Sequence, residues 1–150
     1  MALFKKEKPK VVLGKFQYNT KTPFIAVLKT VIEIGDMEDY EYLCEKSANK
    51  FFEENEKYLL TAINNNEDDF SVFTELLNYF FESFSLGNFE IVINEQEKQI
   101  KIYHYNSPFK EFEKETFLKE FYKTLFQKLL EAEINIKEEK DDEKVIFTVF

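Results

Sequence analysis

The sequence contains no arginine and no tryptophan, and it has little of several other residue types. All 20 basic residues are lysine, so the forked guanidinium group that binds phosphate and carboxylate in bidentate fashion is missing. The single cysteine, Cys44, excludes an internal disulfide and a CxxC metal site. The three glycines, Gly14, Gly35 and Gly87, are too far apart to form a glycine-rich phosphate-binding loop. These absences argue against phosphoryl transfer.

Positive charge is also in short supply. The chain has 29 acidic and 20 basic residues and a formal net charge of −9, and an acidic surface repels a phosphate backbone. The first ten residues lack the apolar core of a secretory signal, and no apolar run approaches the roughly 20 residues that span a membrane. We therefore expect a cytoplasmic protein with no membrane span and no nucleic-acid partner.

Aromatic residues, by contrast, are abundant. The chain has 18 Phe and 8 Tyr, and 44% of its 150 residues are hydrophobic, which is enough for one domain with a substantial core. Two interpretations of the Phe content stay open. Phe replaces Leu in an ordinary core, or the surplus rings line a ligand cavity or an oligomer interface.

The first part of the chain predicts a flexible tail over 1–10, followed by a single domain over 11–150. Residues 11–18 are typical of a short strand or an extended arm. A helix is then expected to begin at Thr22-Pro23, because Thr is a good N-cap and Pro is tolerated at the first helical position. Residues 24–34 are apolar on nearly every side, which is typical of a buried helix.

Two further helices are indicated by apolar residues that recur every three or four positions. The first follows Asp36, and Cys44 lies on its apolar stripe, where a buried core thiol is expected. A turn over 64–69 separates it from the second, which spans 70–84 and is ended by Leu86-Gly87-Asn88.

Alternating apolar and polar residues in the second half predict two β-hairpins, with a long helix over 111–130 between them. Polar links over 95–98 and 137–143 are expected to form the hairpin turns. The four strands are expected at 89–94, 100–105, 133–138 and 144–150. The chain is thus predicted to be an α+β domain of order β-α-α-α-β-β-α-β-β, with helices packed on one face of an antiparallel sheet made of two hairpins.

Residues that could carry chemistry are few. His104 lies between Tyr103 and Tyr105 on a strand, where it is either a structural residue or a general base or haem ligand. The carboxylate pairs lie in expected loops or on polar helix faces, without the desolvated pocket that acid–base catalysis needs. No Gly-x-Ser-x-Gly, His-Glu-x-x-His or EF-hand pattern occurs. We therefore predict no catalytic residue, no metal ligand and no cofactor, and a protein that is not an enzyme.

The segment from Leu86 to Phe150 resembles the C-terminal half of the vinyl-reductase (4-vinyl reductase) domain family. That family shares its fold with the transport-protein-particle (TRAPP) subunits and, more distantly, with haem-nitric-oxide-binding domains. The features that carry the resemblance are a Gly before the strand Phe89-Glu90-Ile91, the strand end Ser107-Pro108-Phe109, a long apolar helix, and a final hairpin ending in Phe147-Thr148-Val149-Phe150.

The resemblance implies a domain that pairs through its helices and holds a small apolar molecule or acyl chain between helix and sheet. Residues 138–150 contain neither Cys nor Gly, so no metal site is carried over from the family.

Three functional hypotheses follow. The first is a non-catalytic binding domain, a homodimer, that holds an apolar small molecule or lipid in an aromatic-lined cavity. The second is a protein–protein adaptor or scaffold that uses an exposed apolar face of helix 24–34. The third is a haem or small-molecule sensor or reductase acting through His104. For the first hypothesis the candidate ligand-binding residues are Phe80, Phe84, Tyr103, Tyr105, Phe121 and Phe126.

Overall fold

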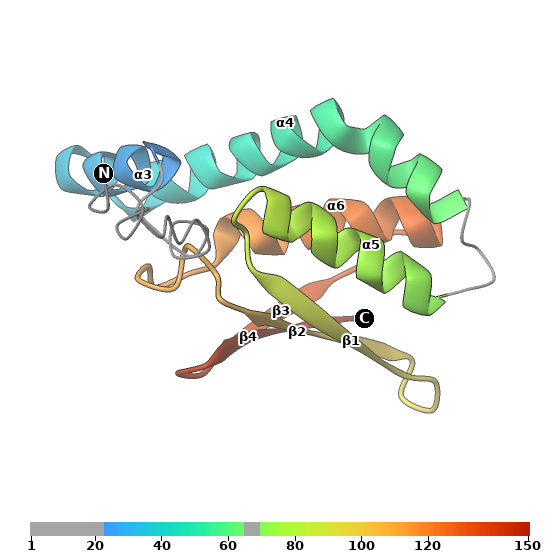
Figure 1. Ribbon diagram of the computed structural model, residues 1–150. Coiled ribbons are helices and arrows are strands. Elements are labelled where there is room, and N and C mark those ends of the chain that lie inside the picture. Colours follow the sequence, from blue (N-terminus) through green and yellow to red (C-terminus); the bar gives the residue numbers. More distant parts are fainter. Residues whose placement is uncertain (1–22, 65–69) are drawn as a thin grey trace, which may run out of the picture.

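The computed structural model describes residues 23–64 and 70–150, which form four helices and a four-stranded antiparallel sheet (Figure 1). The helices are α3 (Pro23–Ile34), α4 (Met37–Asn64), α5 (Phe70–Ser83) and α6 (Thr116–Leu130). The strands are β1 (Asn88–Asn94), β2 (Gln99–Tyr105), β3 (Ile136–Lys140) and β4 (Lys144–Val149). The expected tail over 1–10, the strand over 11–18 and most of the turn over 64–69 lie outside the described residues.

The sheet has the strand order β1-β2-β4-β3, with every neighbouring pair antiparallel. Helices α5 and α6 cover one of its faces, and α4 lies on the far side of these two helices (Figure 1). Side chains on a strand alternate between its two faces, so every second residue of the central strands points toward the helices and is buried. These buried residues include Ile102, His104, Val145, Phe147 and Val149. The predicted α+β class, with helices on one face of two hairpins, is confirmed.

Helix α3 differs from its expected burial. Only Ile25 and Leu28 are buried, whereas the side chains of Val27 and Ile34 are 51% and 82% exposed. The prediction of a fully buried helix is wrong because α3 lies beside α4 at the edge of the fold, so its outward side has no covering helix or strand among the described residues (Figure 1).

Less of the segment after β2 is helical than expected. Helix α6 begins at Thr116 rather than at 111. The preceding residues form a turn, since Phe109 and Phe112 are both buried and the Phe112 amide donates to the Phe109 carbonyl at 2.9 Å. Lys140 also donates to the Phe112 carbonyl at 2.6 Å, which holds this turn against the sheet. Tertiary contacts therefore replaced the first helical turn.

The last hairpin is shifted along the chain. Strand β3 covers 136–140 rather than 133–138, so the connecting turn is confined to residues 141–143. The cause is local, because the Asp141 carboxylate accepts from the amides of Glu143 and Lys144 at 2.8 and 2.9 Å. An aspartate that accepts hydrogen bonds from the amides two and three residues ahead forms a tight turn, so β3 and β4 stay paired up to residues next to that turn.

The connection from α5 to β1 is fixed by backbone geometry. The Leu86 amide donates to the Phe81 carbonyl and the Ser85 amide to the Glu82 carbonyl, at 2.9 and 3.0 Å, with Ser85 in the left-handed region at φ 56°. This pair of bonds is the Schellman helix ending. The side chain of Asn78 then binds both the amide and the carbonyl of Phe89, at 2.7 and 3.0 Å, so edge strand β1 is held to α5. No helix in the described part of the chain is long and apolar enough to cross a membrane.

Candidate functional site

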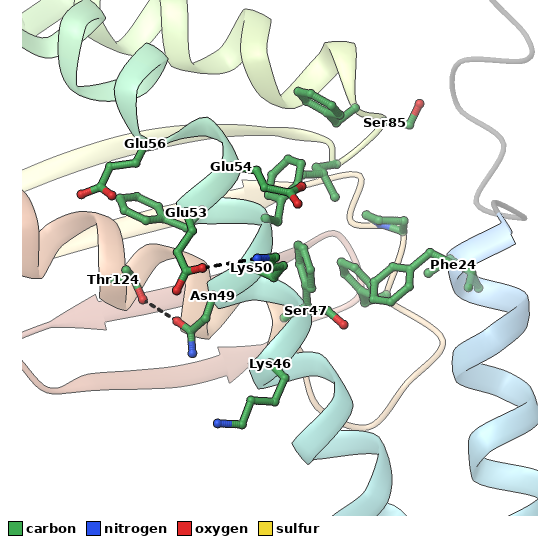
Figure 2. Close-up of a pocket in the computed structure, with 18 of the residues that line it drawn as sticks. Phe24, Lys46, Ser47, Asn49, Lys50, Glu53, Glu54, Glu56, Ser85 and Thr124 are labelled. Atoms are coloured by element: carbon green, nitrogen blue, oxygen red, sulfur yellow. Dashed lines mark hydrogen bonds and ion pairs between the residues drawn. The ribbon is translucent and has the colours of Figure 1, made fainter.

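An open cleft of about 1240 Å³ lies between the first turn of α3, the middle of α4, the end of α5 and the turn at 108–109 (Figure 2). Its lining combines apolar side chains with charged and polar ones. The apolar lining residues are Pro23, Phe24, Ile25, Phe51, Phe52, Phe84, Leu86, Pro108, Phe109 and Phe117. The polar lining residues are Lys46, Ser47, Asn49, Lys50, Glu53, Glu54, Glu56, Ser85, Thr124 and Lys128.

The floor of the cleft is a continuous row of phenylalanine rings. The Phe51 ring lies 4.9 Å from that of Phe84 and 6.0 Å from that of Phe117. The Phe117 ring in turn lies 5.5 Å from Phe24 and 5.1 Å from Phe109. These are ordinary spacings for stabilising ring pairs. Phe109 and Phe117 are buried, but Phe24 and Phe51 are half-buried and Phe84 is 48% exposed, so part of the row faces solvent.

The rim of the cleft carries charges of both signs. Lys50 lies 3.8 Å from Glu53, and Lys128 of α6 lies 3.2 Å from Glu56 of α4. Figure 2 shows the polar side chains of α4, from Lys46 to Glu56, on successive turns of the helix along the cleft. Exposed ion pairs of this kind contribute about 0–1 kcal/mol, so they break at little cost when another charged group approaches. An apolar floor with such a rim suits a molecule that has an apolar chain and a polar end.

The six predicted ligand-binding residues do not meet in one place. Phe84 lines the cleft, and Phe80 and Phe121 lie behind it, each with its ring 5.7 Å from that of Phe51.

The other three predicted residues lie elsewhere. Tyr103 and Tyr105 alternate with the inward-facing His104, so they lie on the face of the sheet opposite to the helices. Phe126 is only 4% exposed and belongs to the core.

Four rings of the floor were not predicted: Phe24, Phe51, Phe109 and Phe117. One signal in the sequence points to Phe51. Adjacent residues on a helix lie about 100° apart, so Phe51 and Phe52 point in different directions. Phe52 is 2% exposed and Phe51 is half-buried, so Phe51 is the more open of the two rings at the cleft.

His104 is a buried residue with both ring nitrogens engaged. Its Nε2 lies 2.6 Å from the Leu86 carbonyl oxygen, which can only accept, so Nε2 carries the hydrogen. The Tyr122 hydroxyl therefore donates to Nδ1, at 2.5 Å. Burial lowers the pKa of His104 to about 4, so the ring is neutral at pH 7. This arrangement offers neither nitrogen to a metal or a substrate, and the described residues contain no group of three His, Cys, Asp or Glu side chains that could hold a metal ion.

A second buried polar group lies below the 107–115 turn. Glu115 is fully buried; the Ser107 hydroxyl donates to its Oε2 at 2.7 Å, and Lys140 Nζ lies 3.4 Å from its Oε1. Burial raises the pKa of the Glu115 carboxyl despite these partners. The Glu115 amide also donates to the carboxylate of Glu138 at 3.1 Å. The group thereby ties the turn to strand β3, which is a structural role.

Cys44 is the one thiol of the chain, and it is fully buried. Burial raises its pKa to about 11, and the thiol lies beside Tyr40, whose hydroxyl donates to the Lys114 carbonyl at 2.8 Å. A protonated, enclosed thiol is a poor nucleophile. Cys44 therefore acts as a core residue, as its place on the apolar stripe predicted.

Comparison of the chain with models of known families and with curated proteins gives no match. The resemblance to the vinyl-reductase family stays a prediction.

Proposed function

We propose that the chain is a non-catalytic binding domain whose cleft holds an apolar chain with a polar end, such as an acyl chain. The observation that carries this proposal is the row of rings that stays partly open to solvent at Phe24, Phe51 and Phe84. Ligand sites are usually concave and mostly apolar, with a few polar groups that orient the ligand. The cleft volume of about 1240 Å³ exceeds the roughly 300–1,000 Å³ of most small-molecule sites, which leaves room for a long chain.

The rim supports a ligand with a polar end rather than a pure hydrocarbon. Lys46 and Lys50 reach the rim from α4 and Lys128 from α6, and all three side chains are exposed. An ammonium group freed from Glu53 or Glu56 gives a carboxylate or phosphate end group a partner, while the apolar chain covers the rings. Covering them removes apolar surface from water at about 25 cal/mol per Å².

The test is the binding of a hexadecanoic acid that carries an environment-sensitive fluorophore. We expect saturable binding to the purified chain and a loss of about tenfold or more in affinity for Phe84→Asp, because one ring contact is worth about 1.5–3 kcal/mol. The side chain of Phe84 is 48% exposed, so this change leaves the fold intact. Tyr79→Asp is the matched control, since Tyr79 lies on α5, which ends one residue before Phe84, is 67% exposed and does not line the cleft. Equal affinities for the two variants would disprove the proposal.

A second role is supported by the outward side of α3. Val27, Val31 and Ile34 follow one another at helical spacing, and Val27 and Ile34 are mostly exposed. We propose that this stripe packs against the same stripe of a second copy, since an apolar patch that matches itself gives a symmetric dimer. This dimer is the paired form that the sequence predicted.

Light scattering coupled to size-exclusion chromatography tests the dimer. We expect Ile34→Glu to give a monomer and Val92→Glu, a change at an equally apolar exposed site on β1, to leave the dimer intact. A wild-type chain that stays monomeric at 100 μM (about the upper range of the method) contradicts this role.

A further inference from the structure

The two edge strands of the sheet differ in how they are protected against pairing with another chain. Edge strand β3 has the sequence IKEEK, in which every residue but the first is charged, and such an edge discourages pairing. Edge strand β1 has the sequence NFEIVIN, with one charged residue and no lysine or proline, and it pairs with β2 in an unbroken register. Its Val92 and Ile93 side chains are 45% and 52% exposed. Strand β1 therefore has the features of an edge that accepts a further strand.

The hydrogen bonds of Asn78 show which backbone groups of β1 point away from β2. The Asn78 side chain binds both the amide and the carbonyl of Phe89, so these two groups lie on the open side of β1. In an antiparallel pair this direction repeats at every second residue, so the amides and carbonyls of Ile91 and Ile93 also lie on the open side. Within residues 23–64 and 70–150 no group pairs with them there. The edge thus offers a donor and an acceptor at each of two positions.

The charges around this edge are mostly negative. Glu75 and Glu82 lie three residues before and four residues after the asparagine that binds β1, so they share its side of α5, and both are exposed. Glu90 of β1 is exposed as well, and the hairpin turn over 95–98 adds two glutamates and one lysine. Neither α5 nor β1 contains a basic residue, and β2 contributes Lys101 beside β1. Five carboxylates and two ammonium groups therefore surround the edge, which favours a basic partner.

We propose that the edge of β1 binds, by strand addition, an extended segment of a partner protein in which apolar residues alternate with lysine or arginine. The segment runs antiparallel to β1, and its apolar residues lie opposite Ile91 and Ile93, with which they exchange amide–carbonyl hydrogen bonds. Opposite residues share a face of the sheet, so these apolar side chains extend the face that the helices cover. The basic residues between them lie on the other face, beside Glu90. The edge is separate from the cleft, so this inference does not depend on the proposed function.

The pairing is tested on the wild-type chain with the amidated peptide KIKVKIK, labelled with fluorescein. We expect saturable binding in fluorescence anisotropy with a dissociation constant of about 100 μM or below. N-methylation of the isoleucines and the valine removes the amides that donate to β1, so it should weaken binding by about tenfold or more. N-methylation of the three internal lysines, whose amides point away from β1, is the matched control and should change the affinity by less than about twofold. Equal affinities for the two methylated peptides would overturn the proposal.

The charge preference is tested with Glu90→Lys, which should weaken the binding of KIKVKIK by about three- to tenfold. Glu139→Lys is the matched control, because it makes the same change at an exposed residue of the opposite edge strand, and the affinity should stay as in the wild type. Equal losses for the two variants would show attraction to net charge alone and would refute binding at β1.

Amide hydrogen exchange locates the bound peptide. We expect the amides of Ile91 and Ile93 to exchange fast in the free chain and at least about tenfold more slowly at saturating peptide. Slow exchange of both amides before peptide is added would also contradict the inference, because the edge would then already be paired.

Discussion

His104 shows how a single buried residue is held by its surroundings. The Leu86 carbonyl accepts from its Nε2, and Gly87, which follows Leu86, has a φ of 93°. A side chain at Gly87 would collide with the Tyr105 carbonyl oxygen and lie 2.9 Å from the His104 Nε2. Glycine is required there because the loop passes so close to the strand. The histidine, the tyrosine above it and the glycine beside it thus form one structural unit.

The pH dependence of His104 is the first prediction. Its pKa in the folded chain is about 4, below its ordinary value of 6.5, so between these values the unfolded chain binds more protons. The free energy of unfolding is therefore expected to fall as the pH falls from 6.5 to 4, by about 3 kcal/mol in all. Because the chain has one histidine, an NMR titration of its ring reports this site alone. A ring that titrates near 6.5 in the folded chain contradicts the prediction, and urea-unfolded chain is the control.

Glu115 is expected to change the free energy of unfolding with pH in the direction opposite to that of His104. A carboxyl whose pKa is raised by burial contributes stability at low pH that is lost as the pH rises through its folded pKa. We expect Glu115→Gln, which cannot ionise, to gain stability relative to the wild type as the pH rises from 4 to 8. Urea unfolding at several pH values measures this difference. Glu113→Gln is the matched control, because Glu113 is exposed and two positions away. A gain that shrinks with rising pH would refute the prediction.

At the scale of elements, the end of α5 offers the clearest substitution. Ser85 holds the left-handed position of the Schellman ending, where an L-residue costs about 1–2 kcal/mol and glycine does not. We expect Ser85→Gly to raise the free energy of unfolding by about 1 kcal/mol and the melting temperature by about 2–4 °C. Ser83→Gly, two residues earlier within α5, should instead destabilise by about 0.5 kcal/mol. The prediction fails if calorimetry shows both changes with the same sign.

The scale of elements also shows why α3 differs from the other helices. Its sequence is more apolar than that of α4, yet α4 has the continuous buried stripe, which includes Tyr40, Cys44, Ala48 and Phe52. The burial of a helix depends on the elements that pack against it, and α3 packs chiefly against α4. The apolar side chains of Val27 and Ile34 therefore face outward, where only another chain or another part of this one can cover them.

At the scale of the whole molecule, the one thiol reports on global opening. Cys44 is fully buried among α4 and its neighbours, and its pKa is raised to about 11. We expect labelling by 5,5′-dithiobis(2-nitrobenzoate) at pH 8 to be at least a thousandfold slower in native than in unfolded chain, since the thiol reacts only through opening. The labelling rate should follow urea in parallel with the circular dichroism transition. Fast labelling without denaturant would contradict this, and a Cys44→Ala chain with Lys101→Cys gives the rate of an exposed thiol.

Much of the fold could be predicted because its signals are local. Alternation in Phe89-Glu90-Ile91 and in Val145, Phe147 and Val149 predicted strands whose apolar sides are the ones that face the helices. Where tertiary contacts compete with local preference, the prediction failed. Helix α6 begins at Thr116 because buried Phe109 and Phe112 hold the preceding residues in a turn, and no local pattern marks that competition.

The candidate site could be predicted only in small part. Phe84 was among the predicted residues and lines the cleft, while Tyr103 and Tyr105 face the other side of the sheet. The sequence by itself determined the fold class and the sides of each element that are apolar, since these depend on neighbours three or four positions away on a helix and two on a strand. Only the tertiary structure decided which rings meet. Phe24, Phe51 and Phe117 come from three helices, and how these helices pack depends on contacts between residues far apart in the chain.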